Sequence, residues 1–252
     1  MIKFFRKIRY DLMGKNKTGK YLKYAIGEIV LVVLGILIAL QLNNYNDTLK
    51  QHKQEQKILQ NLKLDFDYNL SELERNIQNL KNNKKAGLKI ISQTGNKISN
   101  NFSIDSLIDQ ITFTPVYFPQ NGFLLELVNS GKLGIISNET LRNRLSSWFP
   151  TLETLHDREQ IALEYNRHLV LYIIKNGSWL NADKMSTDQQ IRAIDFPASG
   201  FDIDNNEMLK SSEFENFVEN QIVNQTILLG RQEKCINLNK EIIELLDIEI
   251  KK

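Results

Sequence analysis

The longest apolar run of the chain lies near its beginning, between Tyr24 and Leu42. It contains no Lys or Arg, and its central part, Ile29–Leu40, has no polar side chain. A helix of this length spans about 29 Å, close to the thickness of the hydrocarbon core of a bilayer. No small-residue cleavage site follows Leu40, so the pattern favours an uncleaved transmembrane helix over residues 24–42 rather than a cleaved signal peptide.

Two later stretches show the periodicity of long amphipathic helices. In residues 48–84 and in Ser212–Ile250, apolar residues recur at steps of three and four among polar ones. Ser212 followed by Glu215 matches a capping box, which predicts where the second helix begins. Because the two helices have similar lengths, we expect them to pair antiparallel. A parallel homodimeric coiled coil is the weaker alternative, since Asn and Gln interrupt the apolar seam.

The middle of the chain also has helical periodicity. Gly177 predicts the end of the last helix in this region, and residues 112–119, with two prolines, predict a loop or a short extended piece. Residues 178–211 are polar and predict a long irregular connection. The helices predicted here are Ser103–Ile111, Gln120–Asn129, one that begins at Ser137 or Asn138 and passes Trp148, and Thr151–Lys175.

The patterns together predict an all-α protein. No stretch alternates apolar and polar residues for more than a few positions, so we expect no sheet. The expected architecture is an N-terminal transmembrane helix followed by an elongated helical bundle with long antiparallel helices. Its three parts are a basic segment over residues 1–23, the transmembrane helix over residues 24–42 and a helical domain over residues 43–252.

Charge is distributed unevenly between these parts. Residues 1–23 hold eight basic residues and one acidic residue, a net charge of +7, and the other 24 basic and 29 acidic residues give −5. Basic residues beside a transmembrane helix stay on the cytoplasmic side. We therefore expect the N-terminus in the cytoplasm and the helical domain on the far side of the membrane. The basic segment predicts contact with membrane lipid, as an amphipathic helix or as a disordered anchor. The acidic domain argues against a nucleic-acid partner.

One face of the predicted transmembrane helix carries small and polar residues. Glu28, Val32, Gly35 and Ala39 follow one another at steps of four, three and four, and Gly35 with Ala39 forms a small-xxx-small pair that allows close helix approach. This face predicts packing against another transmembrane helix, from a second copy of the chain or from another membrane protein. The alternative for Glu28 is a carboxylate that reaches the cytoplasmic headgroups, since it lies one turn inside Tyr24.

Motifs that would indicate catalysis are absent from the sequence. There is no H-E-x-x-H, no cysteine pair, no G-x-S-x-G and no glycine-rich phosphate loop. Cys235 is the single cysteine, which excludes an internal disulfide, and we expect it to be a small buried residue of a helix. Glu164 and His168 lie four residues apart, and we interpret them as a hydrogen-bonded pair because a zinc site needs further ligands.

Two weaker patterns suggest ion binding. Asp202, Asp204, Asn206 and Glu213 occupy positions 1, 3, 5 and 12 of a calcium-loop template, but the glycine that the template requires at position 6 is Glu207 here. The favoured alternative is a polar loop that leads into the next helix. Arg142 and Arg144 suggest an anion site at a helix start, with surface ion pairs and capping contacts as the favoured alternative. No cofactor is expected.

The apolar segment and its flanks resemble a known family. YLKYAIGEIVLVVLGILIALQLNNYN, preceded by MIKFFRKIR, is similar to the N-terminal signature of a family of uncharacterised single-pass inner-membrane proteins of Gram-negative bacteria. FLLELVNSGKLGIISNETLRNRLSSWF resembles a second signature of that family. The resemblance covers essentially the whole chain. It implies an inner-membrane location and a periplasmic C-terminal domain, and it implies no activity and no catalytic residue.

Three hypotheses for function follow. The first is a non-enzymatic scaffold or adaptor of the cell envelope, since long helices and a candidate transmembrane interface occur without a catalytic motif. The second is a ligand-sensing periplasmic domain that signals through a partner, because helical bundles can transmit small shifts. The third is an enzyme of unknown class.

Overall fold

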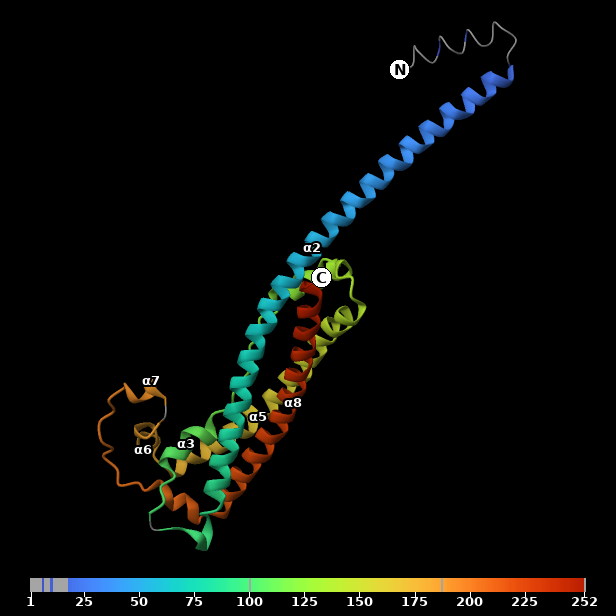
Figure 1. Ribbon diagram of the computed structural model, residues 1–252. Coiled ribbons are helices and arrows are strands. Elements are labelled where there is room, and N and C mark those ends of the chain that lie inside the picture. The colour runs from blue at the N-terminus through green and yellow to red at the C-terminus, as the bar shows by residue number, and fades with distance from the viewer. Residues whose placement is uncertain (1–5, 7–9, 11–17, 100, 187, 252) are drawn as a thin grey trace. The chain divides into compact units, whose positions relative to one another are not determined.

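The computed structural model describes residues 6, 10, 18–99, 101–186 and 188–251. The chain divides into two compact units, Met1–Gln56 and Lys57–Lys252. Every regular element of the described residues is a helix, which confirms the all-α class. In the second unit, parts of three long helices lie side by side and form a bundle (Figure 1).

The first long helix, α2, extends from Thr18 to Ile91 and belongs to both units. The sequence predicted two helices here, over residues 24–42 and 48–84, and this separation was wrong. The polar residues between them are helical too, and side chains one turn apart stabilise them, as where Asn43 Nδ2 donates to Asp47 Oδ2 at 3.3 Å. No Pro or Gly lies between Gly35 and Gly87, so no residue of this stretch interrupts the helix.

The second long helix, α5 (Glu139–Asn176), also joins two predicted helices. Pro150, which lies between the two predicted helices, is inside it. A proline removes one backbone donor and usually kinks or ends a helix. Here Trp148 and Leu155, one on each side of the proline, are both almost fully buried. The hydroxyls of Ser147 and Thr151 donate to carbonyls four residues earlier, at 2.9 and 2.8 Å. Burial on both sides of Pro150 therefore overrides the local preference for a break.

The third long helix, α8 (Ser212–Ile250), has the predicted bounds and lies antiparallel to α2. Lys63 of α2 lies 3.6 Å from Asp247 near the end of α8, and Glu74 lies 3.5 Å from Lys240. Residue numbers thus rise along one helix as they fall along the other, which confirms the predicted pairing. These partly exposed ion pairs report the register and contribute little stability.

Gly87 marks a close approach of α2 and α8. A Cβ atom at this position would lie 2.5 Å from Cγ1 of Ile222, which is closer than real Cβ contacts allow. Glycine in a helix interior costs about 1 kcal/mol relative to alanine, and here it lets the Ile222 side chain of α8 pack against the backbone of α2. The helix therefore continues through Gly87, beyond the predicted end at residue 84.

Short elements connect the long helices. Residues 178–211, predicted to be irregular, contain three short helical turns, which corrects that prediction. The predicted extended piece after α3 is confirmed, because residues 113–121 have no helical assignment. The short elements are η1 (Gly95–Lys97), α3 (Asp105–Thr112), α4 (Gly122–Asn129), η2 (Lys132–Ile135), α6 (Trp179–Lys184), α7 (Gln189–Arg192) and η3 (Asn205–Lys210).

The bundle core consists of two apolar clusters. The larger cluster joins α2, α4, α5 and α8, and in it Phe66 meets Trp148 edge-to-face with ring centroids 5.0 Å apart. The smaller cluster joins the end of α2 to α3, α6, η3 and the start of α8. Along α8 the smaller cluster ends at Val218 and the larger begins at Leu228. The buried positions between them hold the amide side chains of Gln221, Asn224 and Gln225.

Candidate functional site

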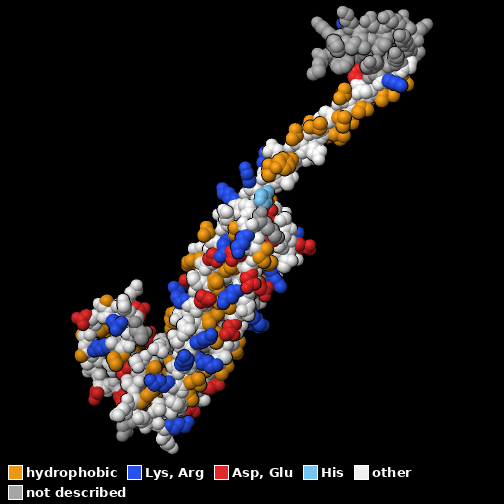
Figure 2. All heavy atoms as spheres, in the orientation of Figure 1, with side chains coloured by type: hydrophobic (Ala, Val, Ile, Leu, Met, Phe, Trp, Pro, Cys, Tyr) orange, Lys and Arg blue, Asp and Glu red, His pale blue; other side chains and the backbone are white. Residues whose placement is uncertain are grey.

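The N-terminal half of α2 exposes its apolar side chains. Large apolar residues from Ile26 to Leu42 are about half exposed in every direction around the helix, and Figure 2 shows them along this segment. Among the described residues one helix is long and apolar enough to cross a membrane, and it is α2. An N-terminal signal sequence can have the same composition. The structure therefore supports a segment that is suited to a membrane.

The predicted interface residues Glu28, Val32, Gly35 and Ala39 all lie on this half of α2. A Cβ atom added at Gly35 would meet no other atom within 4 Å. The helix therefore has room for a second helix at this glycine, as the small-xxx-small hypothesis requires. Packing of this face against a partner stays a prediction.

In the second unit the most unusual feature is the extended segment of residues 113–121. It runs from α3 to α4 antiparallel to α2, and three of its residues, Thr114, Pro115 and Tyr117, are buried in the bundle. A buried extended segment has no neighbouring strand to bond its backbone, so side chains must take that role. The helices around it supply Asn, Gln and Glu.

Three asparagines of α2 bind the backbone of this segment. Asn83 donates to the carbonyl of residue 113 at 2.6 Å, Asn76 to that of residue 116 at 3.2 Å, and Asn69 to that of residue 120 at 2.9 Å. Asn69 also accepts from the N–H of residue 120 at 2.7 Å. The asparagines are seven residues apart, about 10.5 Å along a helix, and three or four extended residues cover about 10–13 Å. The two spacings match, so the three asparagines form a ladder.

Side chains of α8 and α5 make further hydrogen bonds to the backbone of this part of the chain. Gln225 of α8 donates to the carbonyl of Phe113 at 3.2 Å, and Gln221 donates to that of Ile111 at 3.0 Å. Glu159 of α5 accepts from the N–H of Tyr117 at 2.9 Å. The sequence showed amides in the apolar seam, but the repeat of Asn69, Asn76 and Asn83 was not recognised as a binding pattern. The seven-residue spacing was the signal that would have revealed it.

Glu159 is the one buried ionisable side chain in this layer that bonds the extended segment. It is 1% exposed, and burial raises the pKa of its carboxyl to about 7, although the hydrogen bond from the Tyr117 N–H and the nearby Gln232 amide favour the charged form. His156 lies 3.8 Å away but is mostly exposed. Glu159 therefore exchanges its proton near neutral pH.

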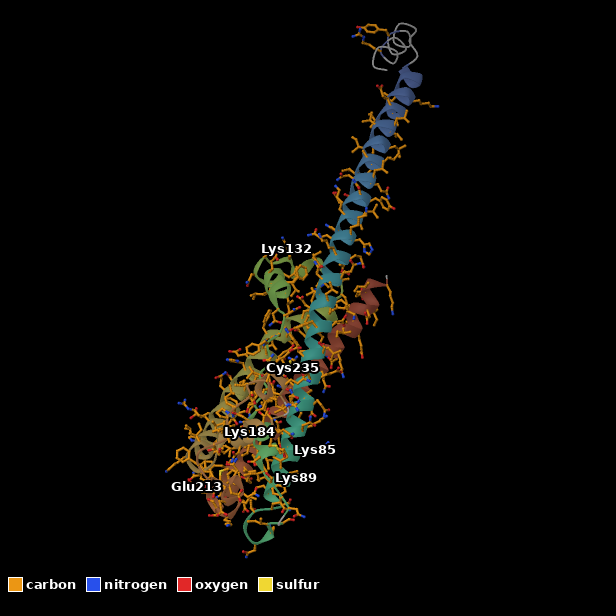
Figure 3. All side chains as sticks on the ribbon, turned by 90° about the vertical axis from the view of Figure 1, so that its left-hand side faces the viewer. Lys85, Lys89, Lys132, Lys184, Glu213 and Cys235 are labelled. Atoms are coloured by element: carbon orange, nitrogen blue, oxygen red, sulfur yellow. The ribbon has the colours of Figure 1, made fainter. Side chains whose placement is uncertain are left out.

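Cys235 lies close to Glu159 on α8, which confirms the prediction of a buried helical cysteine (labelled in Figure 3). Burial, together with the Glu159 charge, raises the pKa of its thiol to about 12, so the reactive thiolate is disfavoured. Gln232 and Asn239 are fully buried on the same helix, and within the described part of the chain their amide atoms have no hydrogen-bond partner at normal distance. Gln232 is near enough to Glu159 to lower its pKa without such a bond.

The residues of the calcium template have separate roles in the structure. Asp204 caps η3 by accepting from the N–H of Asn206 at 2.9 Å. The Asn206 side chain accepts from the N–H of Ile104 at 3.1 Å and donates to the carbonyl of Phe102 at 2.6 Å. Asp202 and Glu213 are exposed. In the described ranges no group of three His, Cys, Asp or Glu side chains is arranged to hold a metal ion.

The arginines considered for an anion site make contacts within the protein. Arg142 donates to the carbonyl of Ile136 at 2.5 Å and to that of Ser137 at 3.0 Å. Arg144 lies 3.0 Å from Glu241 of α8. The favoured alternative of capping contacts and surface ion pairs is confirmed. Glu164 and His168 are exposed neighbours whose Oε1 and Nε2 atoms lie 3.6 Å apart, so the expected hydrogen bond between them is not formed.

The chain matches one protein-family model. The model describes a family of unknown function, DUF6090, and it matches residues 28–225. The chain belongs to this family. The match covers most of the apolar half of α2, the whole asparagine ladder and the start of α8. A search of curated proteins and a search of solved structures found no match. The family match thus confirms the part of the sequence resemblance that pointed to an uncharacterised family. It brings no assigned activity.

Proposed function

We propose that the protein is a non-enzymatic scaffold or adaptor of the cell envelope, anchored in the inner membrane by the first half of α2. The carrying observation is the continuity of α2, which passes from exposed apolar residues into the core of the bundle without a loop. A membrane anchor and a folded domain thus share one helix. The basic residues before the span support a cytoplasmic N-terminus and a periplasmic bundle.

The use of the buried polar residues supports a structural role. Asn69, Asn76, Asn83 and Gln225 bond the backbone of the extended segment, and so does Glu159. Polar side chains that are committed to backbone groups inside a core fix one arrangement of the chain. A domain of this kind presents a defined surface to a partner.

Cysteine labelling tests the proposed orientation. In a Cys235→Ala background, Lys132→Cys places a thiol on the exposed surface of the bundle, and Lys15→Cys places one in the basic N-terminal segment (Lys132 is labelled in Figure 3). We expect a membrane-impermeant maleimide to label the former in cells with a permeabilised outer membrane, and the latter only after lysis. The reverse pattern would contradict the proposed topology.

The candidate transmembrane interface has a matched control. Gly27 and Gly35 are both open helical glycines, but Gly27 lies about 100° around the helix from Glu28 and so outside the face. We expect Gly35→Leu and Glu28→Ala to reduce association several-fold in a membrane two-hybrid assay, and Gly27→Leu to leave it unchanged. Equal association of all three variants would remove the interface hypothesis.

The adaptor role requires a partner of defined stoichiometry. The tagged full chain is captured from gently solubilised membranes and its mass is measured by native mass spectrometry. A second membrane or envelope protein in fixed ratio supports the adaptor role. A monomer or a homo-oligomer alone would contradict it.

A further inference from the structure

A cleft of about 630 Å³ opens in the second unit between the last turns of α2, α3 and the residue that caps α7. This volume lies within the range of small-molecule binding sites. Buried Ala86 and Leu107 form its apolar part, beside the half-exposed ring of Phe113. Figure 3 faces this side of the molecule and labels Lys85 and Lys89 on α2.

The two lysines form a basic wall. Lys85 and Lys89 are exposed, lie one helical turn apart, and have no ion-pair partner in the part of the chain that the structure describes. The Lys89 ammonium lies 5.9 Å from the ring centroid of Phe102, a cation–π distance that orients it. Like charges four residues apart destabilise a helix slightly, and an anion between them would relieve the repulsion.

The opposite wall is acidic and is organised by a buried serine. Ser186, 3% exposed, donates its hydroxyl to Asp109 Oδ2 at 2.7 Å and accepts from the N–H of Asp188 at 3.1 Å. Burial and the nearby charge of Asp109 raise the pKa of Asp183. Across the described residues no Lys or Arg forms an ion pair with Asp109 or Asp188. This wall therefore favours a cation, and its position opposite the lysines suits a ligand with both charges.

Amide side chains from both of these walls also line the cleft. Asn79, Asn82 and Gln110 all contribute to the cleft, and Asn82 accepts from Gln78 at 2.9 Å, which leaves its two N–H donors directed elsewhere. A side-chain amide both donates and accepts, as a peptide group does. Peptide groups therefore suit this part of the lining better than a hydrocarbon or a phosphate chain would.

We propose that this cleft binds a short peptide with unblocked termini. The C-terminal carboxylate lies between Lys85 and Lys89, and the N-terminal ammonium lies at Asp109 and Asp188. The asparagine and glutamine amides bind the peptide groups, and a small side chain packs on Leu107 and Phe113. This proposal adds a ligand to the scaffold and does not depend on its membrane partner.

Calorimetric titration of the full chain in nanodiscs of uncharged lipid tests this site. The probe is trialanine, and the matched control is trialanine that is acetylated at one end and amidated at the other. We expect saturable binding of the free peptide and at least about tenfold weaker binding of the blocked one, since charge-assisted hydrogen bonds at both ends are lost. Equal affinity for the two peptides, or no binding of trialanine at millimolar concentration, would overturn the proposal. So would competition by succinate as strong as that by trialanine, because it would show a simple anion site.

Variants locate the binding. Lys85→Gln with Lys89→Gln, and separately Asp109→Asn, should each weaken trialanine binding about tenfold. Lys81→Gln removes a charge from the same helix outside the cleft and should leave affinity unchanged. Thermal unfolding of each variant shows whether the bundle is intact. If all the variants fold and bind like the original chain, the cleft is not the peptide site.

Discussion

The two halves of α2 use apolar residues in opposite ways. From Ile26 to Leu42 apolar side chains surround the helix and stay exposed, whereas from Ile58 to Leu80 they form one buried stripe. The first half has no polar side chain over Ile29–Leu40, while the second half buries Asn69, Asn76 and Asn83 among its apolar residues. One continuous helix is thus suited to two surroundings. The composition of the first half is suited to a hydrocarbon environment, and the second half needs partners for its asparagines.

The same substitution in each half gives the largest expected contrast. Leu62 is 0% exposed and Leu37 is 54% exposed. Leu62→Ala leaves a cavity in the bundle core and should lower the free energy of unfolding by about 3 kcal/mol. Leu37→Ala should change it by less than about 0.5 kcal/mol. Chemical denaturation of the full chain in detergent micelles measures both. Similar losses would mean that the two halves do not differ in the way described.

Disrupting the asparagine ladder should give the second-largest loss of stability. Asn69→Leu keeps the branching and the number of side-chain heavy atoms but removes both hydrogen bonds to the backbone of residue 120. Because two partly buried backbone groups lose their partner, we expect a destabilisation of about 2 kcal/mol. Asn237→Leu, at an exposed position of α8, is the control and should have little effect. Equal stability of the two variants would show that the ladder does not hold the extended segment.

Glu159 contributes to stability at low pH and loses this contribution as pH rises. A salt-bridged acid does the reverse. Its pKa rises from an ordinary 4.5 to about 7 in the folded chain, so the folded state binds the proton more tightly than the unfolded state does. The contribution is fully present below about pH 4.5 and is lost as pH rises towards 7. Glu159→Gln cannot ionise and should be more stable than the original chain by about 2 kcal/mol at pH 8, with no difference at pH 4. Denaturation curves at the two pH values measure this, and a constant difference between them would contradict it.

The spacing of apolar residues, together with helix-breaking Gly and Pro, predicted most of the fold. The bounds of α8, the antiparallel pairing and the extended piece after α3 followed from local patterns that the structure keeps. The breaks near residue 45 and at Pro150 were predicted wrongly, because helix continuity there depends on neighbouring helical hydrogen bonds and on core burial of Trp148. Tertiary packing overrides local preference in such places.

The candidate sites were harder to predict than the fold. Glu28, Val32, Gly35 and Ala39 follow from helical spacing alone, since they lie on one helix. Lys85 and Asp109 come together only because α3 and the cap of α7 return to α2. No spacing within one segment encodes that meeting. The buried environment of Glu159 depends likewise on residues of two other elements, Tyr117 and Gln232.

At the start of α8 the capping residue that the sequence predicts differs by one position from the one in the structure. Ser212 and Glu215 matched a capping box, but Ser211 is the cap, and its hydroxyl accepts from the N–H of Phe214 at 3.3 Å. Glu215 accepts instead from the hydroxyl of Thr94, which follows the last turn of α2 at the same end of the antiparallel pair. Loss of a serine cap costs about 1 kcal/mol. We therefore expect Ser211→Ala to lower the free energy of unfolding by that amount and Ser212→Ala to change it by only a few tenths. If the larger loss came from Ser212→Ala, the capping box would be correct and the observed start of α8 would be one residue too early.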